Sequence, residues 1–240
     1  MAERIAKFMA RSGVCSRRDA EELIRQKRVT VNGEIVETPA FNVEGTEKIL
    51  LDGEKLPQMD DTRLWLYYKP VGLLTTHKDT QDRQTVFANL PAGMPRVISV
   101  GRLDLNSEGL LLLTNNGELS RKLELPENGW SRRYKVKVHG FLDKKKLAAL
   151  SQGTTVDGIN YGPVKVEIET EKGTNAWLIV TLNEGKNREI RKLMKSVGLD
   201  VARLIRLSYG PFQLGSLKKG EVREVHQKVL REQLGSKFKL

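Results

Sequence analysis

One carboxylate in this chain stands where a reactive group could be held firmly and still reach a ligand. Asp104 lies within Gly-Arg-Leu-Asp-Leu-Asn-Ser-Glu-Gly, residues 101–109. An apolar stretch over 97–100 precedes this segment, and the run of four leucines at 110–113 follows it. The Asn-Ser pair favours a turn, so the pattern predicts a short loop that two core strands hold in place. The same pattern also fits an ordinary aspartate in a turn.

Two further segments carry side chains that could work beside such a carboxylate. Strict alternation over 132–138 predicts a strand with Tyr134, Val136 and Val138 on one face. A tyrosine there is either a core residue or a platform on which a base can stack. The segment 184–194, Glu-Gly-Lys-Asn-Arg-Glu-Ile-Arg-Lys-Leu-Met, has its apolar residues at helical spacing. A guanidinium from it would favour the ionised form of a neighbouring carboxylate.

The composition bounds what the whole chain can be. Its 240 residues suffice for one sizeable domain and a small one. Lysine and arginine outnumber aspartate and glutamate by 41 to 30, which favours nucleic acid as a partner, although a solvated basic surface is the alternative. The sequence has no long apolar run and no signal peptide, so we expect a cytoplasmic protein without a membrane partner. With one cysteine and three scattered histidines, we expect no disulfide and no metal.

The N-terminal segment has the pattern of a small module. Helical spacing over 4–28, broken at Ser12 and Gly13, predicts two short helices, with Ser16 as the N-cap of the second. An Asn-Gly pair predicts a hairpin over 29–36. So few elements form too small a core to be very stable alone.

A polar stretch divides the chain. We assign residues 1–56 to the small module, 57–62 to a linker and 63–240 to a larger domain. A short polar linker would allow the two domains to move relative to each other.

Several segments resemble, in order, the motifs of the RNA pseudouridine synthases, in the branch that contains RsuA, RluB, RluE and RluF. They are Tyr-Lys-Pro-Val-Gly at 68–72, the Asp104 loop, Arg-Arg-Tyr-Lys-Val at 132–136, the basic segment 184–194, and Arg-Leu-Ile-Arg at 203–206. Residues 3–48 resemble the S4 RNA-binding domain. The resemblance covers nearly the whole chain. It implies an α+β protein, with a small α/β S4 domain followed by a synthase domain whose mostly antiparallel central sheet is flanked by helices.

The resemblance also implies roles for individual residues. Asp104 would be the nucleophile, Tyr134 would stack on the target base and assist proton removal, and Arg191 would form an ion pair with Asp104. Arg102 and Leu204 would bind substrate, and Lys69 would either contact phosphate or be structural. The implied RNA-binding residues are Arg4, Lys7, Arg17, Arg18, Lys27, Arg28, Lys186 and Arg188.

The implied reaction is the isomerisation of a flipped-out uridine to pseudouridine in ribosomal RNA, by a monomer without a cofactor. The first expectation for the target is 23S ribosomal RNA near the peptidyl-transferase centre, free or in an assembly intermediate of the large subunit. Two alternatives stay open: a synthase acting on 16S ribosomal RNA, and a non-catalytic S4-type RNA-binding or ribosome-assembly protein. A glycosidase-like hydrolase would need a second acid, for which Glu108 is the nearest candidate in sequence.

Overall fold

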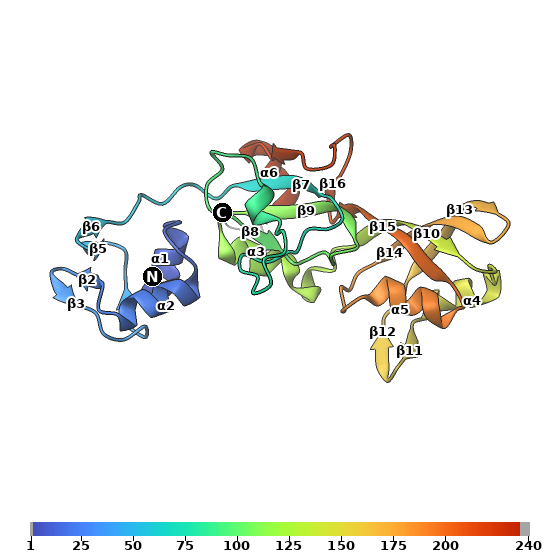
Figure 1. The fold of residues 1–240 in the computed structure, drawn as a ribbon, viewed down its shortest axis with the longest axis horizontal. Helices are drawn as coiled ribbons and strands as arrows, with labels where there is room; N and C mark the ends of the chain where they lie inside the picture. Colours follow the sequence, from blue (N-terminus) through green and yellow to red (C-terminus); the bar gives the residue numbers. More distant parts are fainter. Residues whose placement is uncertain (1, 236–240) are drawn as a thin grey trace. The chain divides into compact units, whose positions relative to one another are not determined.

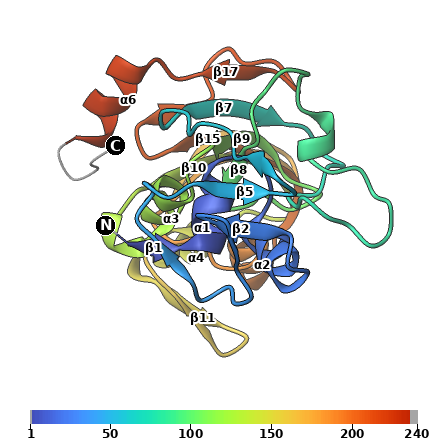
Figure 2. The same ribbon diagram turned by 90° about the vertical axis from the view of Figure 1, so that its left-hand side faces the viewer.

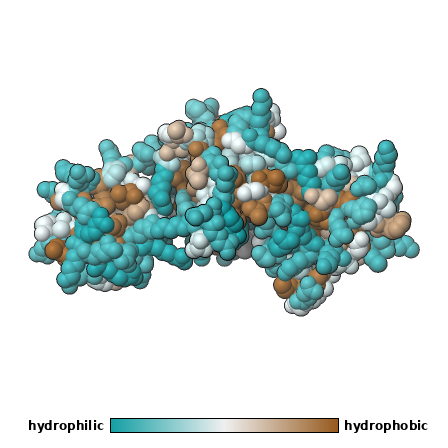
Figure 3. All heavy atoms as spheres, viewed as in Figure 1, coloured by the Kyte–Doolittle hydropathy of each residue, from teal (hydrophilic) through white to brown (hydrophobic). Residues whose placement is uncertain are grey.

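The computed structural model describes residues 2–235, which divide into two compact units. The first unit holds the residues up to 63 together with 93–98 and 115–117, and the second holds the remainder. Hydrophilic side chains cover most of the face seen in Figure 3. None of the helices within 2–235 is long and apolar enough to cross a membrane.

The first unit packs two helices against a small sheet. The helices are α1 (Ile5–Arg11) and α2 (Arg17–Arg25). The four-stranded sheet has the order β3-β2-β5-β6, with β2 (Val29–Val31), β3 (Glu34–Ile35), β5 (Ile49–Leu51) and β6 (Glu54–Lys55). Buried apolar residues from both helices and the sheet form one core, and Figure 2 shows these elements together.

Local chemistry explains most of the first unit. Ser16 caps α2 in a reciprocal capping box with Asp19, as predicted. The hairpin between β2 and β3 turns at its Asn-Gly pair, where both residues have positive φ. Two boundaries differ from prediction. Arg4 lies in β1 (Glu3–Arg4), which pairs with the distant β4 (Asn42–Val43), and α2 ends before Lys27, whose φ is +57°.

The second unit is built on a nine-stranded sheet (Figure 1). Its main path has the order β13-β14-β10-β15-β9-β7-β17, while β16 pairs with β15 and β8 with β9. The strands are β7 (Leu64–Lys69), β8 (Ile98–Val100), β9 (Glu108–Thr114), β10 (Arg132–His139), β13 (Lys165–Lys172), β14 (Asn175–Leu182), β15 (Asp200–Tyr209), β16 (Phe212–Gln213) and β17 (Val222–Glu224). Along the path only β15 and β9 run parallel, so the prediction of a mostly antiparallel sheet is confirmed.

Helices and a hairpin complete this unit. The helices are α3 (Gly117–Glu124), α4 (Lys144–Ala149), α5 (Glu189–Ser196) and α6 (Gln227–Leu234), with 3-10 turns η1 (Phe87–Asn89), η2 (Pro126–Asn128) and η3 (Leu150–Gln152). The hairpin consists of β11 (Thr154–Val156) and β12 (Ile159–Tyr161), and it projects beside α5 in Figure 1.

Strand β9 is the centre of the second core. All four leucines of its run 110–113 are fully buried, as expected for a strand covered on both faces. Leu110 and Leu112 share a cluster with apolar residues of α3 and α6. The loop that carries Asp104 therefore enters a strand that packing holds rigidly.

Gly109 allows β9 to approach β15 closely. Its φ is +105°, and a Cβ there would lie 2.6 Å from the backbone nitrogen of Arg206 and closer still to the carbonyl oxygen. We expect Gly109→Ala to lower the free energy of unfolding by about 3 kcal/mol or more, because neither backbone can yield. Gly173 also has a positive φ, but a Cβ there would meet open space. Gly173→Ala should therefore lower the free energy of unfolding by only about 1 kcal/mol. Urea unfolding measures the free energy of unfolding of both variants. Equal losses of stability would refute the explanation by close approach of the two backbones.

Candidate active site

A cavity of about 860 Å³ opens in the second unit. The residues around it come from the loop before β9, from β10 and β15, and from the segment that leads into α5. Asp104, Tyr134 and Leu204, which are far apart in the sequence, all line it. The fold therefore brings these three predicted site residues to one place.

The loop of Asp104 has a fixed backbone and an accessible carboxylate. It connects β8 to β9, as the sequence predicts. The backbone N–H of Ser107 donates to the Asp104 carbonyl at 3.0 Å, and Gly72 N–H donates to the Leu105 carbonyl at 2.9 Å. The Thr75 hydroxyl donates to the Leu103 carbonyl at 2.9 Å. The Asp104 side chain keeps 24% of its surface exposed to the cavity and solvent.

Lys69 fixes the same loop from below. Its side chain is completely buried, and its Nζ donates to the carbonyls of Pro70, Asp104 and Ser107 at 3.0, 3.1 and 2.9 Å. A buried ammonium cannot reach an RNA phosphate, so of the two interpretations for Lys69 only the structural one fits. Burial lowers the pKa of Lys69 to about 8, against the opposing pull of the Asp104 and Glu108 carboxylates.

The predicted ion pair between Arg191 and Asp104 is wrong. Arg191 donates instead to the backbone carbonyls of Val201 at 3.0 Å and Asn106 at 2.8 Å. Among the described residues, the cation within ion-pair distance of Asp104 is Arg188, whose Nη1 lies 3.9 Å from Oδ2, while Arg191 feels the Asp104 charge from farther away. Arg188 precedes α5 in the left-handed conformation, with φ +52°, and this turn places it ahead of the helix. Arg191 acts on the Asp104 loop through Asn106.

Tyr134 and Leu204 lie on the cavity side of neighbouring strands. In the β10–β15 register, Val136 is opposite Leu204 and Tyr134 is opposite Arg206. Facing partners project from the same side of a sheet, so these side chains form one surface. Tyr134 is mostly buried, and it lines the cavity together with Leu204.

Arg102 and Glu108 occupy different environments. Arg102 is exposed at the edge of the cavity. Glu108 is buried, and it pairs with Arg203 and Lys219 while accepting a hydrogen bond from Tyr68. Burial alone would raise the pKa of Glu108, but these two cations outweigh it and hold the pKa below the ordinary value. Glu108 does not line the cavity, so it is not the second acid that a glycosidase would need.

Comparisons with known proteins agree with this geometry. The model of the family described as RNA pseudouridylate synthase matches residues 63–196, and that of the S4 domain matches residues 3–49. The chain belongs to the RNA pseudouridine synthases. It is thus an isomerase, and its S4 domain binds RNA.

Relatives of this synthase cover most of its length. It is 50% identical over 95% of its length to an uncharacterized RNA pseudouridine synthase of Rickettsia bellii, 99% of which is covered. It is 40% identical over 89% of its length to the ribosomal large subunit pseudouridine synthase B of Yersinia pestis, 69% of which is covered. A crystal structure of a pseudouridylate synthase has a TM-score of 0.69 and 27% identity, with 97% of this chain and 99% of that chain covered.

Several residues lining the cavity of this synthase were assigned no role from the sequence, among them Arg132, Glu189 and Arg206. Arg132 donates to the carbonyls of Asn183 at 3.1 Å and Glu184 at 2.7 Å. Arg206 is buried, and so is Glu189, whose pKa is raised chiefly by burial. Both arginines lie within the motifs at 132–136 and 203–206, and these motifs were the sequence signal that could have found them.

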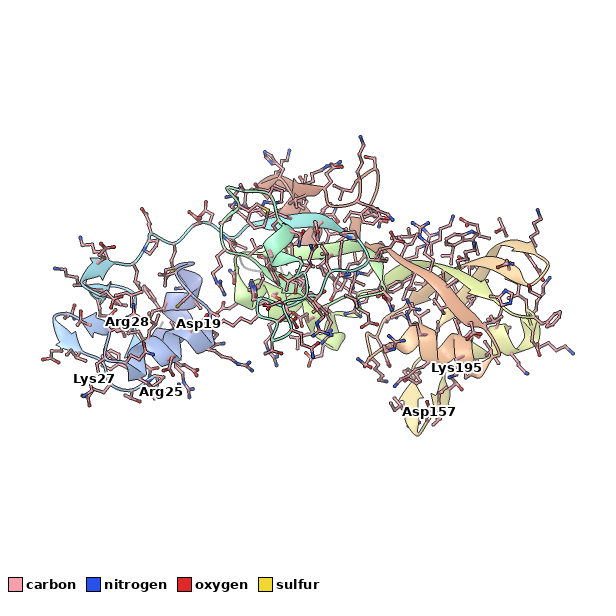
Figure 4. The ribbon with its side chains drawn as sticks, viewed as in Figure 1. Asp19, Arg25, Lys27, Arg28, Asp157 and Lys195 are labelled. Atoms are coloured by element: carbon pink, nitrogen blue, oxygen red, sulfur yellow. The ribbon has the colours of Figure 1, made fainter. Side chains whose placement is uncertain are left out.

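The cations predicted to bind RNA fall into two groups, and those of the first group are held by partners within the protein. Lys27 pairs with Glu37, and Arg28 pairs with Asp52, both at 2.6 Å. Figure 4 labels these two cations. In the basic segment, Lys186 is held by the Glu184 carboxylate and the Asn160 carbonyl, each at 2.5 Å.

The second group has fewer internal partners. Arg17 and Arg18 are exposed at the start of α2, and no ion pair engages them among residues 2–235. Arg4 is also exposed, whereas Lys7 pairs with Glu3 at 3.3 Å. Arg4, Arg17 and Arg18 are therefore the predicted RNA-binding cations of the S4 domain that are exposed and have no ion pair among the described residues.

The strained backbone of Arg188 permits a test of its partnership with Asp104. Glycine adopts the left-handed conformation without a steric penalty. We expect Arg188→Gly to unfold at an unchanged or slightly higher temperature, while its single-turnover rate falls about tenfold because the carboxylate loses its neighbouring cation. Thermal unfolding measures the stability of the variant, and single-turnover assays measure its rate. A variant that loses stability in parallel with activity would show that Arg188 is structural.

Proposed function

We propose that this synthase converts a uridine of 23S ribosomal RNA, near the peptidyl-transferase centre, to pseudouridine, with Asp104 as the nucleophile. The observation that carries the proposal is the meeting of an accessible carboxylate and an aromatic ring in one cavity. Tyr134 and Leu204 line that cavity together with Asp104. The similarity to a large-subunit ribosomal enzyme of Yersinia pestis supports the choice of RNA.

A uridine within folded RNA must leave its stack before its glycosidic bond can be reached, at a cost of a few kcal/mol. Stacking on Tyr134, worth roughly 1–3 kcal/mol, would offset part of that cost. Leu204 would support the base beside the tyrosine. The carboxylate of Asp104, held by its rigid loop, would then attack the nucleoside at the ribose or at the uracil ring.

The reaction is an isomerisation and balances without a co-reactant. The bond between C1′ and N1 breaks, the base turns, and a bond between C1′ and C5 forms. C5 loses its proton and N1 gains one, and Tyr134 would assist the removal at C5. No redox change or net hydrolysis occurs, so the proposal needs no cofactor.

The basic surfaces would provide the attraction for the RNA backbone. Arg17 and Arg18 of the S4 domain would contact phosphates, and Arg102 and Arg188 would do so at the edge of the cavity. One such site per chain makes a monomer sufficient. An enzyme that modifies ribosomal RNA would act in the cytoplasm.

Release of tritium distinguishes the possible targets. We would incubate the protein separately with 23S and 16S transcripts labelled at C5 of uridine, and with large ribosomal subunits. The proposal predicts release from 23S RNA, free or in the particle, and none from 16S RNA. Release from 16S RNA alone would overturn the assignment of the target while leaving the reaction intact.

A further inference from the structure

Arg206 is a buried arginine whose charge has no anionic partner. Only 3% of its surface is exposed. Its Nε donates to the Leu110 carbonyl at 2.7 Å, whereas Nη2 is buried without a partner. No carboxylate pairs with it among the described residues. A guanidinium remains charged in proteins, and burying it unpaired is costly, so such a group is expected where a ligand completes its hydrogen bonds.

The neighbouring Arg132 has no such unpartnered terminal nitrogen. Arg132 also lines the cavity, but it donates to the carbonyls of Asn183 and Glu184, and its Nη2 donates to the Tyr209 hydroxyl at 2.9 Å. Its terminal nitrogens are thus occupied by the protein. Among the described residues that line the cavity, the buried guanidinium nitrogen without a partner belongs to Arg206.

The fold places Arg206 beside the ring on which the base would stack. Arg206 is opposite Tyr134 in the β10–β15 register, and both line the cavity. A bulge at this point shifts the register, so that Tyr209 lines the cavity as well, with its ring 5.3 Å from the Arg206 Cζ. Facing Cβ atoms on neighbouring strands are about 5 Å apart, so Arg206 lies at the edge of the stacking surface.

The position of Arg206 determines which part of the nucleotide it would contact. Phosphates would be met at the edge of the cavity, where Arg102 and Arg188 are exposed. A base stacked on Tyr134 presents its edge to Arg206 instead. The acceptors on the edge of uracil are the carbonyl oxygens O2 and O4, and a guanidinium offers only donors.

Resting on the proposed function, we propose that Arg206 is a catalytic residue that donates to a carbonyl oxygen of the flipped uracil. When the bond between C1′ and N1 breaks, its electron pair stays on the base, and the negative charge spreads onto O2 and O4. A preorganised cation in a water-poor cavity stabilises such charge strongly. The charge disappears when C5 bonds to C1′ and N1 takes up a proton, so Arg206 itself neither gains nor loses a proton.

The test combines a change in the protein with a change in the base. We would prepare synthetic RNA spanning the site that the wild-type protein modifies, with the target uridine unmodified, 2-thio or 4-thio. Sulfur accepts hydrogen bonds poorly, so the wild-type single-turnover rate should fall about 10- to 100-fold for one of the two thio positions. Arg206→Met should be slow on every RNA and should lose that discrimination, while its Kd for the RNA changes little, because backbone contacts dominate affinity.

Controls separate this role from a structural one. Arg203→Met alters the same strand at an arginine that pairs with Glu108 outside the cavity, and it should keep the wild-type discrimination. Arg206→Lys, which retains the charge, should recover part of the rate. The proposal is overturned if Arg206→Met matches Arg203→Met in rate, or if it still discriminates against sulfur.

The wild-type measurement stands even if every Arg206 variant fails to fold. Acceptance of both thio RNAs at the normal rate would refute the contact by itself. Failure of the proposed function looks different, because the wild-type protein would then form no pseudouridine in any RNA.

Discussion

Asp104→Asn is expected to abolish pseudouridine formation while leaving RNA binding and folding intact. The rate should fall by on the order of 10⁴-fold, as when other enzymes lose their nucleophile, because an amide cannot replace the attacking carboxylate. The fold should be unaffected, since the contacts that hold this loop are made by the backbone of Asp104 rather than by its side chain. Single-turnover release of tritium from C5 measures the reaction, and fluorescence anisotropy measures binding.

A second carboxylate supplies the control for that substitution. Asp157 lies at the exposed tip of the β11–β12 hairpin (Figure 4), so Asp157→Asn removes the same charge away from the cavity. It should retain the wild-type rate. Turnover by Asp104→Asn at more than a tenth of that rate would exclude Asp104 as the nucleophile.

Lys69→Met is expected to damage both stability and activity. The change removes three hydrogen bonds to buried or partly buried carbonyls, of which the Asp104 carbonyl keeps only its bond from the Ser107 N–H. The free energy of unfolding should fall by about 3 kcal/mol, and the rate of the folded protein by about 100-fold, because the Asp104 loop loses its anchor. Urea unfolding and single-turnover assays at a temperature where the variant is folded separate the two effects.

A surface lysine gives the matched comparison for Lys69. Lys165 is exposed and pairs only with Glu167, so Lys165→Met should change the free energy of unfolding by less than about 0.5 kcal/mol. If Lys69→Met behaved like Lys165→Met in both assays, the Asp104 loop would not depend on the buried ammonium.

The same lysine predicts how activity depends on pH. Three carbonyl acceptors require all three N–H bonds of an ammonium, and burial lowers the pKa of Lys69 to about 8. Raising the pH through this value removes a proton, so one of the three carbonyls loses its hydrogen bond from Lys69. The single-turnover rate should therefore decline above about pH 8. A rate that stays constant to about pH 9.5 would show that the ammonium is not needed.

Much of the architecture follows from local patterns. The capping box at Ser16, the Asn-Gly hairpin and the leucine run of β9 depend on neighbouring residues, and each is confirmed. Asp104, Tyr134 and Leu204, to which the motif resemblance assigns roles in one site, line the same cavity.

The remaining features depend on long-range geometry. Arg188 adopts a left-handed conformation, which non-glycine residues rarely do. This turn brings the Arg188 side chain, in place of that of Arg191, within ion-pair distance of Asp104. The burial of Lys69 depends on three carbonyls, two of which lie more than 30 residues away. The β10–β15 bulge brings Tyr209 to the same face as Arg206 through a shift in register that no local pattern encodes.

Mapping of pseudouridine at nucleotide resolution tests the central claim most directly. Ribosomal RNA that lacks the modification would be incubated with the wild-type protein and, in parallel, with Asp104→Asn. The account predicts one new pseudouridine in 23S RNA with the wild-type protein and none with the variant. A modified site that forms equally well with both proteins would contradict it.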